Sequence, residues 1–89
     1  MNQTARYIFD ALARANVTIS DFAKLTSISR QTLHHWKAGG AINDTIRLNL
    51  AYNTAKRITT ATDTKKLPLV EKIPAAERVV VLKRIILGG

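Results

Sequence analysis

Arg30, Gln31, His34 and His35 form a polar stretch whose side chains can hydrogen-bond to the edges of nucleic-acid bases. Arginine can donate two hydrogen bonds to guanine O6 and N7, and glutamine can pair with adenine N6 and N7. No acidic residue interrupts this stretch, so an anionic partner would meet no repelling carboxylate there. These four residues are therefore predicted to read base edges in the major groove of double-stranded DNA.

A helix is predicted over the polar stretch, from residue 30 to about residue 38. Ser29 can cap its first turn, and the glycine pair at 39–40 can end it because glycine tolerates a positive φ. Steps of 100° per residue place Leu33 and Trp36 on the side opposite the polar residues. Both apolar side chains are therefore expected in the core, which leaves the polar face exposed.

Another short helix is predicted directly before this one, ending at about residue 25 or 26. Thr18 can accept a hydrogen bond from the backbone N–H of Asp21, as in a capping box with Asp in place of Glu. Residues 27–29 then interrupt the helical pattern. Two short helices joined by a turn of three or four residues are the layout of a DNA-binding helix-turn-helix.

The segment TISDFAKLTSISRQTLHHWKAG, Thr18 to Gly39, resembles the helix-turn-helix of the lambda-repressor and Cro-like family, also called the XRE type. The positions that carry the resemblance are Phe22, Ala23, Ile28, Leu33, Trp36 and Gly39. With upstream apolar residues, it covers about residues 6 to 58. It implies an all-α fold, a compact bundle of four to five helices, and DNA binding in which Arg30 and Gln31 fall where the family reads bases.

Two positions depart from the family pattern. The family commonly has glycine where this chain has Ser27, and a positive φ there would cost a non-glycine residue about 1 kcal/mol or more. The turn is therefore expected to be shaped differently. The family also often has a phosphate-contacting glutamine at the first position of the first helix, and Ile19 cannot make that contact.

Phosphate contacts are predicted for polar residues around the helix pair, since such contacts position a protein on DNA without reading sequence. Asn43 and Asp44 are expected to open a fourth helix that runs to about residue 62, and backbone N–H groups at such a start can bind phosphate. The predicted phosphate-contacting residues are Lys24, Lys37, Asn43 and Arg47.

The C-terminal segment, residues 75–87, is expected to be a helix that begins after Pro74, with a β-strand as the alternative. Its apolar residues form a seam at spacings of four and three. This seam has no obvious partner in so small a chain, and the fourth helix also carries a second apolar face. A homodimer is therefore expected, with an interface of Ile46, Leu50, Val79, Leu82 and Ile86. Within this interface, two routes are open: Ile46 and Leu50 receive the C-terminal segment of their own chain or that of the partner.

Three regions follow from these patterns: a DNA-binding domain at 1–62, a threonine-rich linker at 63–74 and an oligomerisation segment at 75–89. The resemblance implies a Cro-like repressor that binds a two-fold symmetric operator as a dimer. A DNA-binding antitoxin or a phage lysogeny-type activator would share these features. The alternative from another class is a protein-interaction module that retains the helix-turn-helix scaffold and uses the apolar C-terminal segment.

Composition supports a nucleic-acid partner and argues against other classes. Fourteen Lys and Arg against six Asp and Glu give a net charge of +8 in 89 residues. No cysteine is present, the carboxylates are scattered, and adjacent histidines on a helix diverge by about 100°. We therefore expect no catalytic site, no metal site, no cofactor, no small-molecule ligand and no membrane partner, and we expect the protein to act in the cytoplasm.

Overall fold

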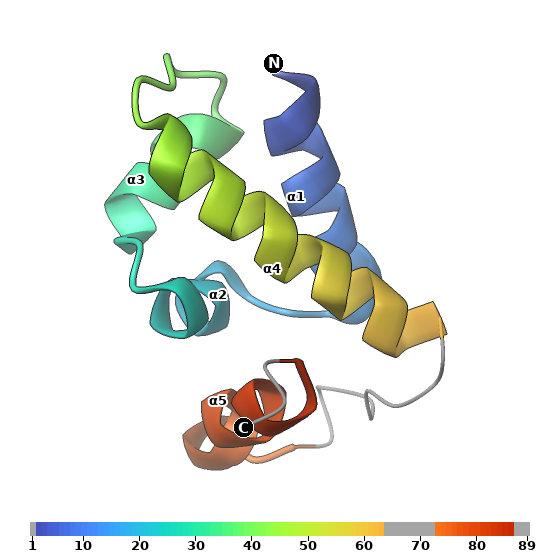
Figure 1. Ribbon diagram of the computed structural model, residues 1–89. Coiled ribbons are helices and arrows are strands. Elements are labelled where there is room, and N and C mark those ends of the chain that lie inside the picture. The colour runs from blue at the N-terminus through green and yellow to red at the C-terminus, as the bar shows by residue number, and fades with distance from the viewer. Residues whose placement is uncertain (1, 64–72, 87–89) are drawn as a thin grey trace.

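Five helices form in the part of the chain that the computed structural model describes, residues 2–63 and 73–86 (Figure 1). They are α1 (Gln3–Ala15), α2 (Ile19–Thr26), α3 (Arg30–Lys37), α4 (Thr45–Asp63) and α5 (Ala75–Ile86). No strand occurs in these residues, so the all-α prediction is confirmed and the strand alternative is wrong over α5. Residues 64–72 of the predicted linker, and residues 87–89, lie outside the described part.

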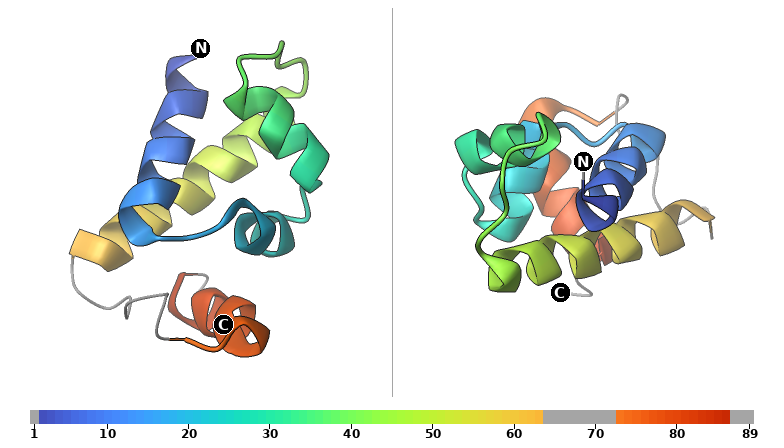
Figure 2. Two further views of the ribbon diagram at one scale, coloured as in Figure 1. Left: turned by 180° about the vertical axis from the view of Figure 1, so that it is seen from behind. Right: turned by 90° about the horizontal axis from the view of Figure 1, so that it is seen from above.

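Capping residues define the beginning and the end of α1. The Oδ1 atom of Asn2 accepts the backbone N–H of Thr4 at 2.7 Å and caps the helix that begins at Gln3. Asn16 adopts a left-handed conformation, with φ 56°, and ends the helix. The helix packs along α4, and α2 and α3 lie beside this pair (Figures 1 and 2).

Hydroxyl caps also set the starts of α2 and α3. Thr18 Oγ1 accepts the backbone N–H of Asp21 at 3.0 Å, and Ser29 Oγ accepts that of Thr32 at 3.1 Å, as predicted. Between the helices Ser27 adopts a left-handed conformation with φ 61°. The expectation of a differently shaped turn is therefore wrong: the serine accepts the positive φ that glycine would adopt with less strain.

All five helices contribute to one hydrophobic core. In each of the first four, the buried residues recur at the three- and four-residue spacings that the sequence predicts for an amphipathic helix. The largest fully buried side chains are Phe22, Ile8, Ile28, Leu33, Ile58 and Leu82.

α5 packs against α2 and α4 of its own chain (Figure 2). Leu82 is 0% exposed, Ile86 is buried and Val79 is half-buried against the core. The seam is therefore covered within its own chain, by α2 and α4, whereas Ile46 and Leu50, the residues expected to receive it, remain exposed. Helix α5 shares the core of the preceding helices, so it does not stand apart from residues 1–62 as a separate segment.

A buried ion pair fixes α5 to α2. Arg78 Nη1 donates to Asp21 Oδ2 at 3.3 Å, and both side chains are largely buried. The second terminal nitrogen of Arg78 donates to the carbonyl oxygen of Ile73 at 3.4 Å. Breaking such a pair leaves an unpaired charge in the interior. Asp21 therefore stabilises the fold in two ways. Its backbone N–H donates to the Thr18 hydroxyl, and its carboxylate forms an ion pair with Arg78 of α5.

A helix that crosses a bilayer needs about 20 predominantly apolar residues. No helix in residues 2–63 and 73–86 is both long and apolar enough to do so. The longest, α4, alternates buried residues with charged and polar ones over its 19 residues.

Candidate nucleic-acid interface

α3 has one buried side and one exposed side. Leu33 and Trp36 lie in the core, as predicted. Arg30, Gln31 and His34 are all exposed on the remaining surface of the helix. His35 is exposed as well, so all four predicted base-reading residues are accessible. Arg30, Gln31 and His34 share one face at the start and middle of this eight-residue helix.

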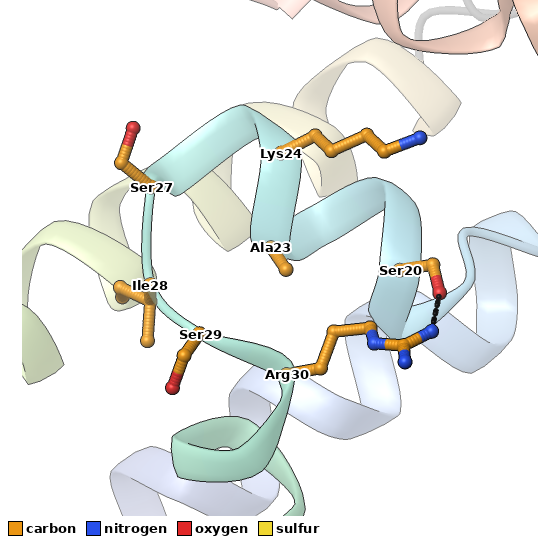
Figure 3. A pocket seen from close by; sticks show the side chains of 7 residues that line it. All are labelled: Ser20, Ala23, Lys24, Ser27, Ile28, Ser29 and Arg30. Carbon is orange, nitrogen blue, oxygen red and sulfur yellow. Dashed lines mark hydrogen bonds between the residues drawn. The ribbon is translucent and has the colours of Figure 1, made fainter.

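Arg30 is held by a residue of the neighbouring helix. Its Nη1 atom donates a hydrogen bond to Ser20 Oγ at 3.1 Å (Figure 3). Ser20 lies in the first turn of α2, so this bond spans the two helices and restrains a long, rotatable side chain. A guanidinium has five N–H donors in a fixed plane, which leaves donors for a ligand. Restraint of that plane favours bidentate recognition, because both donors must meet their acceptors together.

α2, the turn and α3 surround a shallow depression of about 480 Å³ (Figure 3). The residues that line it are Ser20, Ala23, Lys24, Ser27, Ile28, Ser29 and Arg30. Three hydroxyls and two cations can hydrogen-bond to phosphate oxygens or base edges, and apolar side chains suit a thymine methyl group. The depression joins the predicted phosphate residue Lys24 to the predicted base-reading residue Arg30.

His35 lies differently from the other three predicted base-reading residues. Its ring covers the backbone of Gly40, so closely that a Cβ atom added at Gly40 would overlap the ring. The backbone N–H of Gly40 also donates to the carbonyl oxygen of His35 at 2.9 Å. His35 therefore packs on the loop that follows α3 while part of the residue stays exposed.

Lys37 is exposed at the end of α3, as expected for a phosphate contact. It lines a second depression, of about 490 Å³, together with residues of α1: Arg6, Phe9, Asp10 and Ala13. The exposed cation Arg6 was missed by sequence analysis. Its 31-residue separation from Lys37 gave no local pattern, and only the packing of α1 beside α3 brings both to one depression.

The predicted phosphate site at the start of α4 is not supported. The helix begins at Thr45, and the Asp44 carboxylate accepts the backbone N–H of Arg47 at 3.0 Å. Arg47 also pairs with that carboxylate at 3.5 Å. A carboxylate at this position takes up a donor that a phosphate would use and repels an anion. Asn43 is exposed in the preceding loop, outside the helix.

His34 and His35 of α3 are of a residue type that binds metal ions. Within residues 2–63 and 73–86, no three His, Asp or Glu side chains come together as a metal site would require.

Comparisons with known proteins gave no family. No family model, curated protein or solved structure matches the chain. The fold and the site thus define the class by themselves: a small all-helical protein with two short helices, a three-residue turn between them and an exposed polar face.

Proposed function

We propose that the protein is a sequence-specific regulator that binds double-stranded DNA through α3, in the manner of a Cro-like repressor. The observation that carries the proposal is the exposed face of α3, where Ser20 restrains Arg30 beside Gln31. These residue types pair with guanine and adenine, and a helix after such a turn fits the major groove. The resemblance of residues 18–39 to the lambda-repressor family supports the same assignment.

Charge supports a polyanionic partner for this face. The chain carries +8, and the exposed cations Lys24 and Lys37 flank the polar residues of α3 at two depressions. Arg6 adds a third cation beside Lys37. Such residues supply affinity that does not depend on sequence and falls as salt rises, whereas Arg30 and Gln31 supply preference among sequences.

As a repressor, the protein would act in the cytoplasm by occupying a promoter and obstructing polymerase, a steric mechanism that needs no cofactor. Two copies would place their α3 helices in successive major grooves of a two-fold symmetric operator, roughly 34 Å apart. A DNA-binding antitoxin or a lysogeny-type activator would use the same face. The protein-interaction alternative loses part of its support, since Leu82 and Ile86 serve the chain's own core.

The test begins with selection of bound fragments from the source genome, followed by gel shifts on the selected site and on scrambled DNA. Arg30→Ala or Gln31→Ala is expected to cost about 1–3 kcal/mol on the selected site and to relax preference at one position. Lys37→Ala is expected to weaken both DNAs alike and to lower the salt slope by about one.

Arg14→Ala is the matched control for charge. Arg14 lies at the C-terminal end of α1, exposed and paired with Asp63 at 3.4 Å, so its removal takes one cation from outside α2 and α3. Equal losses for Arg14→Ala and Arg30→Ala on both DNAs would show that α3 contributes only charge. Failure to enrich any fragment would contradict sequence-specific binding.

A further inference from the structure

The exposed side of α4 carries two apolar residues that α5 does not cover. Ile46 is 82% exposed and Leu50 is 47% exposed, although α4 buries its core side against the other helices. The helix lies along one side of the molecule (Figure 2). Asn53 and Arg57, both exposed, continue the line of these residues at spacings of three and four. An exposed stripe of four residues therefore runs along roughly 16 Å of α4.

The C-terminal part of this stripe borders a cationic depression of about 320 Å³. The residues that line it are Asn53, Lys56, Arg57 and Thr60. The Nζ atom of Lys56 lies 5.6 Å from the centroid of the Tyr52 ring, a cation–π contact that restrains the lysine side chain. The Tyr52 ring lies 5.2 Å from that of Tyr7 in α1, which supports this contact. We refer to the stripe and this lysine as the outer face of α4: Ile46, Leu50, Asn53, Lys56 and Arg57.

No acidic residue neutralises the two cations of the outer face of α4. The sequence has no carboxylate between residues 45 and 62. The acidic residues at either end of this range already have partners: Asp44 pairs with Arg47, and Asp63 with Arg14. Within residues 2–63 and 73–86, neither Lys56 nor Arg57 forms an ion pair. Both charges are therefore available to an anionic partner.

We propose that the outer face of α4 binds an acidic amphipathic helix of another protein. Its carboxylates pair with Lys56 and Arg57, and its apolar side chains cover Ile46 and Leu50. Residues at spacings of three and four form the ridges through which one helix packs against a second. Burial of the apolar residues supplies affinity, and the two charges select an acidic partner and set its orientation.

Two other occupants match only part of this face. A nucleic-acid backbone offers phosphates to the cations but no apolar surface to Ile46 and Leu50. A second copy would bring the same cations against the face, and each chain carries a net charge of +8. An acidic protein segment with apolar residues matches both the cationic and the apolar part.

The outer face of α4 shares no residue with the two depressions beside α3. It also lies on a different helix from the C-terminal segment. The inference therefore goes beyond the proposed function and does not depend on it.

The test is fluorescence anisotropy of the full chain without DNA, at physiological ionic strength, with a labelled helical peptide as the acidic probe. The probe has two glutamates and two leucines at the spacings of Lys56, Arg57, Leu50 and Ile46, in antiparallel order. A second version has the same residues in parallel order. One of the two is expected to bind with a Kd below about 1 mM, in the range of a weak interface. Replacing the probe's glutamates by lysine, or its leucines by alanine, is expected to weaken binding at least about tenfold.

Substitutions in the protein locate the contact. Arg57→Glu is expected to raise the Kd of the acidic probe about tenfold, and Ile46→Ala about fivefold. Lys83→Glu and Val80→Ala are the matched controls, because they make the same kinds of change on exposed residues of α5. Both controls should leave the Kd within about twofold, since distant exposed charges are screened. Circular dichroism and Trp36 fluorescence establish that each variant is folded.

Three outcomes would overturn the proposal: no binding of either acidic probe, equal binding of the lysine or alanine versions, or equal effects of Arg57→Glu and Lys83→Glu. If Arg57→Glu lowers affinity for scrambled DNA far more than Lys83→Glu does, while the acidic probe fails to bind, the face belongs to nucleic acid instead. The probe assay contains no DNA, so its failure would leave the proposed function of α3 unaffected.

Discussion

α3 and α5 are both short helices that bury one apolar side, yet their exposed sides differ in kind. The free side of α3 carries hydrogen-bond donors and cations and no carboxylate, whereas that of α5 carries two valines between opposite charges. The first composition suits a polyanion, whereas the second combines an apolar surface with one charge of each sign. The core side of each helix fixes its place in the fold, and the exposed side determines which partner it can bind.

The difference between the sides of α5 predicts the largest effect. Leu82→Ala removes a fully buried side chain and is expected to lower the free energy of unfolding by about 2–5 kcal/mol. Val80→Ala, on the exposed side of this helix, is expected to change it by no more than about 0.5 kcal/mol. Urea unfolding at a concentration where the chain is monomeric measures both. Similar values for the two variants would contradict the orientation of the helix.

An intermediate effect is expected for Ser20→Ala, which releases Arg30 without altering its charge. The side-chain restraint is worth about 0.5–1.5 kcal/mol, as for a typical hydrogen bond. Affinity for the selected DNA site should fall by that amount, while affinity for scrambled DNA stays within about twofold. Gel shifts on both DNAs measure this split. A uniform loss on the two DNAs would assign Ser20 to phosphate contact instead.

The smallest effect concerns the turn between α2 and α3. Ser27→Gly relieves a left-handed residue that costs about 1–2 kcal/mol, but glycine adds about 0.4–1 kcal/mol of unfolded-state entropy. A net gain in stability of about 0.5 kcal/mol is expected by urea unfolding. Ser20→Gly is the control, because the same substitution inside α2 should destabilise by a similar amount. A loss at both positions would contradict the strain at Ser27.

Local signals account for the parts of the fold that sequence analysis predicted correctly. The starts of α2 and α3 depend on hydroxyls that cap backbone groups three residues away. The side of α3 that faces the core follows from the spacing of Leu33 and Trp36. Such short-range determinants are complete within a dozen residues, so periodicity and capping rules suffice to find them.

Non-local contacts account for the errors. Periodicity showed that Leu82 and Ile86 share a side, but it could not show that α2 and α4 cover that side. Asp21 was predicted as part of a cap, whereas its pairing with Arg78 depends on the packing of α5. Arg6 and Lys37 likewise meet at one depression only in three dimensions.

The ion pair between Asp21 and Arg78 has a consequence for the order of events during synthesis. The two residues are 57 positions apart, and a ribosome adds about 5–20 residues per second. For roughly 3–11 s after Asp21 is made, Arg78 has not yet been synthesised and the Asp21 carboxylate has no ion-pair partner. During this time the surface of α2 and α4 that α5 later covers is exposed. The core that supports α2 and α3 is completed only when α5 arrives. The nascent chain thus passes through a stage in which the surface proposed to read DNA rests on an open core.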